Sequence, residues 1–263
     1  CHPGSRTQPR PDRQHSRILM SCPEPMPMPH ADATKAQLIV ALDLPTRKAA
    51  LDMALKLRGT VRWCKVGMEV FTLAGPDFLE ELHRLGYHVF LDLKFYDIPH
   101  TVAQAVKAAA AAGVRLLTVH CQGGERMCRA AVEAVHAAPN RPLIFGVTAL
   151  TSFAAGEMPG ISVPPADFTL TLARCAADWN LDGVVCSAHE ASAVRAACPE
   201  LLRLCPGIRP AGSPATDQRR VMTPADAVME GANYLVVGRP VTASADPAEA
   251  AQAILEEITS AAP

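Results

Sequence analysis

Charged side chains close three apolar runs in the first third of the chain. Asp43 follows the first run, Lys65 lies near the end of the second, and Asp92 and Lys94 close the third. Side chains two residues apart in a strand point the same way, so we expect Asp92 and Lys94 on one face. Carboxylates and ammonium groups in a partly desolvated site keep one another charged. A lysine held in this way can deliver a proton to a developing carbanion.

Each of these four charges also has a purely structural interpretation. Asp92 and Lys94 could be an ion pair that only closes the end of a strand, Lys65 could be a rim lysine, and Asp43 could cap the following helix. Buried charges are costly unless they are paired or solvated. Four such charges at the same ends of successive strands argue against a purely structural explanation of the whole group.

A second group of residues near the carboxyl terminus is suited to holding a phosphate. Gly238 and Arg239 come directly after the last apolar run, and Gly207 and Arg209 follow the run before it. Glycine lets backbone N–H groups approach an anion, and arginine supplies a forked charge. Residues 207–222, which include Gln218, form a loop long enough to act as a lid over such a site. The alternatives are an ordinary surface loop and a rim arginine.

Short apolar runs, typical of strands covered on both faces, alternate with amphipathic segments from Gln37 onward. The expected strands are residues 38–43, 61–66, 88–93, 116–121, 143–147, 183–187, 202–205 and 234–237. Thr46 is a candidate N-cap for the first helix, which would run to Leu57, and Pro76 should begin the second. The remaining expected helices are residues 101–112, 125–137, 166–180, 189–197, 224–230 and 247–258.

Eightfold alternation of strand and helix within this length favours an α/β fold, a single-domain (β/α)8 TIM barrel. A doubly wound open sheet is the main alternative, but it often carries a glycine-rich turn after its first strand. Here that strand ends in Asp43, Leu44 and Pro45, without a glycine-rich turn. In a barrel, functional side chains gather at the carboxyl ends of the strands. The barrel would therefore bring both groups of residues to one face.

Composition limits the partners and the surroundings. The chain has 263 residues, a net charge of −1 and nine cysteines. Without a basic excess we expect no nucleic-acid surface, and no apolar run reaches the ~20 residues of a membrane span. Scattered cysteines without metal-ligand spacing predict reduced thiols in a cytoplasmic protein. Residues 1–34 are rich in proline and are expected to be a disordered tail, leaving residues 35–263 as the barrel domain.

Residues 92–99, DLKFYDIP, resemble the DxKxxDIP signature of the orotidine 5′-phosphate decarboxylases. Further elements resemble that family in the same order along the chain. They are Asp43 after the first strand, residues 65–67 (KVG), residues 147–152 (VTALTS), residues 206–210 with 217–220 in the lid, and residues 237–240 (VGRP). The resemblance covers residues 37–258. It implies decarboxylation of orotidine 5′-phosphate (OMP) to UMP in pyrimidine biosynthesis, without a metal or an organic cofactor.

The resemblance also implies roles for the charged residues. Lys94 would protonate C6 of the pyrimidine after CO2 leaves, and Asp92 would lie near the departing carboxylate. Lys65 and Asp92 would flank Lys94. Asp97 would reach into the site of a neighbouring subunit, which makes the active unit a homodimer.

The same resemblance implies the substrate contacts. Asp43 and Thr101 would contact the ribose hydroxyls, and Thr151 would contact the pyrimidine. The phosphate would be held, or its lid shaped, by Arg209, Gln218, Gly238 and Arg239.

Two other functions are compatible with parts of the pattern. Mg2+-dependent phosphosugar decarboxylases of the same suprafamily also carry DxKxxD, but they resemble one another in having an acidic metal-binding residue where this chain has Lys65. A non-catalytic barrel that senses UMP would need no proton donor. Lys65 and the Ile98-Pro99 continuation argue against the phosphosugar decarboxylases, whereas a UMP sensor would be recognised by a function that survives Lys94→Ala.

Overall fold

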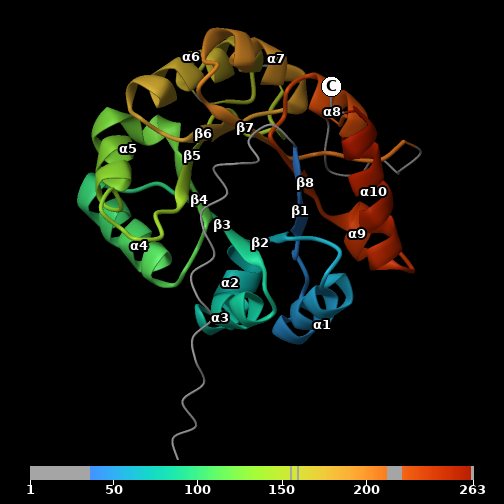
Figure 1. Cartoon of the computed structure of the whole chain (residues 1–263). Coiled ribbons are helices and arrows are strands. Elements are labelled where there is room, and N and C mark those ends of the chain that lie inside the picture. Colours follow the sequence, from blue (N-terminus) through green and yellow to red (C-terminus); the bar gives the residue numbers. More distant parts are fainter. Residues whose placement is uncertain (1–35, 155, 159, 212–220, 262–263) are drawn as a thin grey trace, which may run out of the picture.

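Figure 1 shows a ring of strands surrounded by helices, in a computed structural model that describes residues 36–154, 156–158, 160–211 and 221–261. The strands of these residues close into a parallel barrel in the order of the sequence, and β8 pairs with β1. The predicted TIM barrel is therefore confirmed. The strands are β1 (Gln37–Ala41), β2 (Trp63–Gly67), β3 (His88–Phe95), β4 (Leu116–His120), β5 (Leu143–Val147), β6 (Gly183–Val185), β7 (Leu202–Cys205) and β8 (Tyr234–Val237).

The helices follow the predicted alternation, with two additions. They are α1 (Arg47–Leu57), α2 (Met68–Ala74), α3 (Asp77–Arg84), α4 (Pro99–Ala111), α5 (Gly124–Glu133), α6 (Pro165–Asp178), α7 (Ala188–Ala197), α8 (Pro224–Met229), α9 (Arg239–Thr242) and α10 (Pro247–Ala261), with a 3-10 turn at Cys121–Gly123. The sequence did not predict α2 and α9, which begin directly after β2 and one residue after β8. Neither has a side-chain N-cap, and both are short, at seven and four residues; α9 does have a proline in its first turn, a start signal that was not used.

Local signals identified several helix ends correctly. The Thr46 hydroxyl accepts a hydrogen bond from the backbone N–H of Ala49 at 3.1 Å, as expected of an N-cap. Gly113 and Gly231 follow α4 and α8 with φ of 79° and 96°, a left-handed conformation that glycine adopts without a steric penalty. No helix in the described part of the chain is long and apolar enough to span a membrane.

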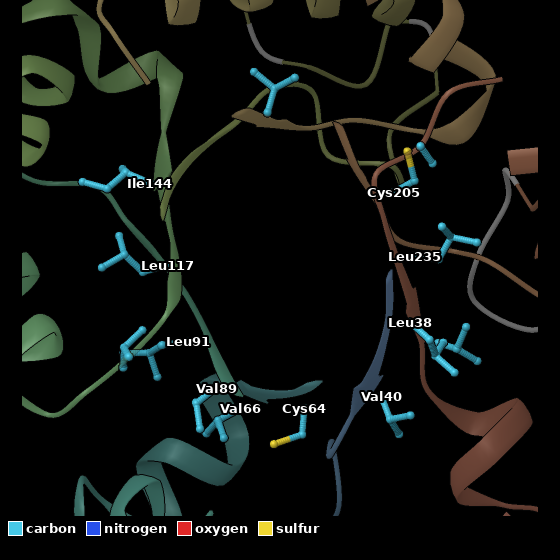
Figure 2. Packing of buried hydrophobic residues seen from close by; sticks show 14 of the residues in the cluster. Leu38, Val40, Cys64, Val66, Val89, Leu91, Leu117, Ile144, Cys205 and Leu235 are labelled. Atoms are coloured by element: carbon cyan, nitrogen blue, oxygen red, sulfur yellow. The ribbon is translucent and has the colours of Figure 1, made fainter. Parts of the chain in front are cut away.

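Apolar side chains form two layers that fix the barrel. Alternate strand residues point outward, and in Figure 2 the labelled side chains of β1 to β5, β7 and β8 turn away from the ring toward the helices. The other set points inward and packs in the barrel interior. It consists of Ile39, Ala41, Trp63, Phe90, Leu116, Phe145, Leu204, Tyr234 and Val236. Residues two further along several of these strands therefore lie at the carboxyl-terminal mouth.

The expected tail, residues 1–34, lies outside the described residues, so the predicted domain boundary stays a prediction. Part of the expected lid, residues 212–220, also lies outside them. The described ends of that loop are joined: the backbone N–H of Arg209 donates to the carbonyl of Met222 at 3.0 Å. This pairing fixes where the loop leaves and rejoins the barrel.

Candidate active site

Four charged side chains from the first three strands form a continuous chain of contacts at the barrel mouth. The Lys65 ammonium donates to both Asp43 carboxylate oxygens, at 2.8 and 3.0 Å. It also lies 3.9 Å from Asp92 Oδ2. The Lys94 ammonium donates to Asp92 Oδ1 and Oδ2, each at 2.8 Å. Opposite charges alternate along the whole array, so each group has an oppositely charged neighbour.

The order within this array differs from the expected one. We expected Lys65 and Asp92 to flank Lys94, whereas Asp92 lies between the two lysines and Asp43 lies at the far end. The reason is the strand order, because β2 is the direct neighbour of β3 and brings Lys65 to the side of Asp92 away from Lys94. Lys94 therefore ends the array and is bonded to a single carboxylate in it.

Burial increases from Asp43 toward the middle of the array. The side chain of Asp43 is 50% exposed, whereas those of Lys65 and Asp92 are 10% and 14% exposed. Lys94 is 26% exposed. The inner pair is thus shielded from water while Lys94 still reaches the solvent-accessible space, as a proton donor to a bound molecule must.

Gly67 leaves the room that the array needs. A Cβ atom built on it would lie 2.7 Å from Asp43 Oδ1 and 2.8 Å from Lys65 Nζ, closer than real Cβ contacts. Its φ of −89° is open to any residue, so only space requires the glycine here. The sequence pointed to KVG as a motif but not to this reason for its glycine.

The array forms one side of a cavity of about 590 Å3 at the mouth. That volume is in the range of small-molecule sites. Its apolar wall comes from the strands opposite, through Val147, Val185, Leu204 and Val236. Thr151 and Ser152, which follow β5, also line it. The cavity therefore has a charged wall, formed by the array, and an apolar wall, formed by the four side chains from β5 to β8.

The arginines of the expected phosphate site line the same cavity and follow β7 and β8. Arg209, Gly238 and Arg239 line it, as does Gly207, whose φ of 80° requires a glycine. Burial, together with the nearby charge of Arg239, lowers the pKa of Arg209 from its usual value. Two guanidinium groups that disfavour one another in this way favour an anion between them. Gln218, assigned to the same site, lies outside the described residues.

Asp97 and Thr101 do not line this cavity. Asp97 is exposed on the turn before α4, where its carboxylate accepts a hydrogen bond from the backbone N–H of Ile98 at 2.6 Å. Thr101 is exposed in the first turn of α4. The expected contact of Thr101 with ribose hydroxyls stays a prediction. Asp97 and Thr101 are thus both exposed, on the segment that joins β3 to the first turn of α4.

His120, at the end of β4, is a neighbour of the array that the sequence did not indicate. Burial and the Lys94 ammonium lower the pKa of His120, although Asp92 opposes this effect. The imidazole ring packs 5.5 Å from the ring of Tyr96. His120 lies two residues beyond Thr118, whose hydroxyl contacts both Asp92 and Lys94.

Thr118 and His120 were both missed in the sequence for the same reason. Thr118 and His120 continue the inward-facing row of β4 that begins at Leu116, so strand periodicity could have placed them near the array. Their residue types alone did not indicate a functional role, because threonine and histidine at a strand end occur in many roles. Their neighbours come from a different strand and only the barrel brings them together.

Comparison with known proteins gives a consistent result. A model of the orotidine 5′-phosphate decarboxylase / HUMPS family matches residues 36–254. The chain is 53% identical over 229 residues to the orotidine 5′-phosphate decarboxylase of Nitratidesulfovibrio vulgaris strain DP4, covering 85% of this chain and 97% of that protein. It is 49% identical over 229 residues to the Pseudomonas aeruginosa LESB58 protein of the same name, covering 86% and 99%.

A solved structure agrees with these relatives. The orotidine 5′-phosphate decarboxylase of Lactobacillus acidophilus superposes with a TM-score of 0.76 at 36% identity, covering 85% of this chain and 99% of that one. Because the family model matches most of the chain, and relatives about half identical to it align over nearly their whole length, the chain belongs to the orotidine 5′-phosphate decarboxylase / HUMPS family.

Proposed function

We propose that this protein decarboxylates OMP to UMP in pyrimidine biosynthesis, without a cofactor and with Lys94 as the proton donor. The observation that carries the proposal is the Asp43–Lys65–Asp92–Lys94 array beside a cavity that two arginines also line. The names of the aligned relatives support the same substrate.

The array fits the charge changes of this reaction. When the bond between C6 and the carboxylate breaks, the electron pair stays on C6 and neutral CO2 leaves. The Lys94 ammonium then gives a proton to C6 and regains one from water. Asp92, bonded to Lys94, would lie near the carboxylate and disfavour its negative charge, a repulsion that ends when CO2 forms. On its other side, Asp92 has the Lys65 ammonium at 3.9 Å.

The remaining assigned residues divide the substrate between them. Arg209, Gly238 and Arg239 line the cavity and would hold the phosphate, and the family resemblance assigns Gln218 to the same role. Thr151 would contact the pyrimidine. Asp43, half exposed at the end of the array, would accept hydrogen bonds from ribose hydroxyls.

Lys65 favours this reaction over that of a Mg2+-dependent phosphosugar decarboxylase. Its ammonium lies 2.8 Å from Asp43 and 3.9 Å from Asp92. A cationic group therefore already occupies the space between the two carboxylates. A divalent ion bound by the same carboxylates would face that ammonium at short range, which is electrostatically unfavourable.

The direct test is incubation of the protein with OMP in the presence of EDTA, with UMP measured as the product. We expect stoichiometric conversion that added Mg2+ does not increase. Formation of UMP only after Mg2+ is added, or turnover of a phosphosugar acid in place of OMP, would overturn the proposal.

We also propose that the active unit is a homodimer in which Asp97 enters the partner's site. Asp97 lies outside its own cavity and is flanked by large exposed apolar side chains, Tyr96 at 59% and Ile98 at 66% exposure. Such side chains next to one another are typical of a protein interface. Thr101, on the same segment, would reach the ribose of the partner's substrate rather than its own.

Mixing two inactive variants tests the shared site. Asp97→Ala and Lys94→Ala chains, after subunit exchange, should form mixed dimers with one intact site and regain part of the activity. Gel filtration and exchange of a labelled chain would first establish that dimers exist and that subunits exchange. Exchange without any return of activity contradicts the shared site.

We further propose that the protein works in the cytoplasm. The seven cysteines of the described residues are all free thiols, and six of them are buried. Reduced thiols are the rule in that compartment. Cell fractionation with an antibody to the protein tests this location; recovery in a membrane or secreted fraction would contradict it.

A further inference from the structure

The strand that carries the proposed proton donor is irregular at that residue. Leu91 of β3 pairs with Leu117 of β4, but the next pair joins Phe95 to Val119. Four steps on β3 thus match two steps on β4, and residues 92–94 face Thr118 alone. Lys94 has a φ of 50°, in the left-handed region that residues with a Cβ atom rarely adopt. β3 therefore bulges where Asp92 and Lys94 meet.

At this bulge, the side chain of Thr118 bonds to β3 where the backbone pairing between β3 and β4 is interrupted. Its hydroxyl oxygen accepts a hydrogen bond from the backbone N–H of Lys94 at 3.0 Å. The same hydroxyl donates to Asp92 Oδ1, also at 3.0 Å. One hydroxyl can do both, because it carries one proton and two lone pairs. The residue is 1% exposed, so water does not compete for either bond.

These two bonds fix the relative position of the two reacting groups. One holds the backbone of Lys94 in its unusual conformation, and the other orients the carboxylate whose oxygens both lie 2.8 Å from the Lys94 ammonium. Unfavourable backbone conformations persist only where the surroundings enforce them. Thr118 itself does not line the cavity, so it has no direct contact with a molecule bound there.

We propose that Thr118 is a positioning residue, whose hydroxyl sets the geometry between Asp92 and the proton donor Lys94. This inference rests on the proposed function, because it assigns Thr118 a role in that reaction. It predicts an effect on the chemical step and little effect on substrate binding. The arginines that also line the cavity do not depend on Thr118.

A pair of substitutions isolates the hydroxyl. Thr118→Ser and Thr118→Ala both lose the γ-methyl group, and they differ only in the hydroxyl. With OMP as substrate, we expect Thr118→Ala to lower kcat by about tenfold to hundredfold, the usual effect of misplacing a catalytic group by a fraction of an ångström or more. KM should change little, and Thr118→Ser should recover most of kcat. If Thr118→Ala does not fold, Thr118→Val keeps the side-chain volume and removes the hydroxyl.

Thr148 provides the matched control. It is also 1% exposed at the end of a strand, and its hydroxyl donates to the carbonyl of Val185 at 2.7 Å. Thr148→Ala and Thr148→Ser should show a similar difference in melting temperature without the difference in kcat. Equal kcat in the two Thr118 variants, or an equal kcat loss in Thr148→Ala, would overturn the inference. An inactive wild-type protein would instead refute the proposed function.

Discussion

The two ends of the barrel use the same strands for opposite purposes. At the amino-terminal end, β2 and β3 contribute Trp63 and His88, whose rings lie 5.0 Å apart. Two residues further, β2 contributes Lys65, and four residues further β3 contributes Asp92. Along these two strands, the inward-facing side chains change from packed rings to paired charges within two to four residues. One end is filled by aromatic side chains and the other surrounds a cavity.

Polar groups at the two ends are satisfied differently. At the amino-terminal end, the guanidinium of Arg203 donates to the carbonyls of Leu201 and Gly231, and Arg141 pairs with Asp182 at 2.8 Å. These bonds tie loops to strands. At the mouth, the charges bond mainly to one another and border open space. The difference agrees with the general separation in such barrels between a stabilising end and a functional end, and it can be tested by substitutions at each.

The largest expected effect is at the mouth, in Lys94→Ala. Loss of a general acid typically lowers the rate by about 10²- to 10⁴-fold. We therefore expect kcat with OMP to fall by at least that range while the melting temperature changes little. Lys48→Ala, which removes an exposed lysine paired with Asp52 at 2.6 Å, is the matched control and should leave kcat unchanged. Retained turnover in Lys94→Ala would contradict the proton-donor role.

Phe145→Ala tests the packed interior of the barrel. The side chain is fully buried in the barrel interior, with its ring 5.8 Å from that of Tyr234. Truncation of a buried phenylalanine lowers the free energy of unfolding by about 3–5 kcal/mol. Chemical denaturation should show that loss, with kcat per folded molecule preserved at low temperature. Phe71→Ala on α2, where the ring is only partly buried, should cost less. A loss of kcat without a loss of stability would contradict the division between the packed interior and the mouth.

Two glycines sharpen the same contrast. Gly67→Ala at the mouth places a Cβ 2.7 Å from Asp43 Oδ1 and should displace the ion pair. Gly183→Ala, at the start of β6, places one 2.5 Å from both the Leu202 carbonyl and the Phe145 ring. We expect kcat/KM to fall by about tenfold or more in Gly67→Ala, because misplaced catalytic groups act poorly. Gly183→Ala should mainly lower the melting temperature. The reverse outcome in both variants would refute the assignment.

The last expected effect is on stability alone, a pH dependence from His88. Burial, followed by the charges of Arg115 and Arg62, lowers its pKa from 6.5 to about 4. Between these values the unfolded chain binds more protons than the folded one. The stabilising contribution is therefore complete above pH 6.5 and is lost as the pH falls toward about 4, at no more than about 1.4 kcal/mol per pH unit.

Denaturation at several pH values, comparing the wild type with His88→Gln, would measure this slope. His136→Gln is the control, since His136 is exposed on the surface. An unchanged slope in His88→Gln would show that other groups cause the loss of stability in acid.

Much of the fold could be predicted because its signals are local. The eight strands were expected from apolar runs, and the N-cap at Thr46 from residue type alone. Short helices without caps, such as α2 and α9, carry no such signal and depend on the strand they follow. The mouth charges could be expected to meet because parallel strands end at the same face, but the order of contacts among them could not.

The sequence by itself determined the alternation of elements, the inward-facing pair Asp92 and Lys94, and the motifs that indicate the family. These depend on residue type and spacing along one segment. Only the tertiary structure decided that Asp92 lies between two lysines, that Gly67 makes room for the Asp43–Lys65 pair, and that Thr118 spans the bulge at Lys94. The physical reason is that each of these contacts joins neighbouring strands, and their register and bulges are set by packing of the closed barrel.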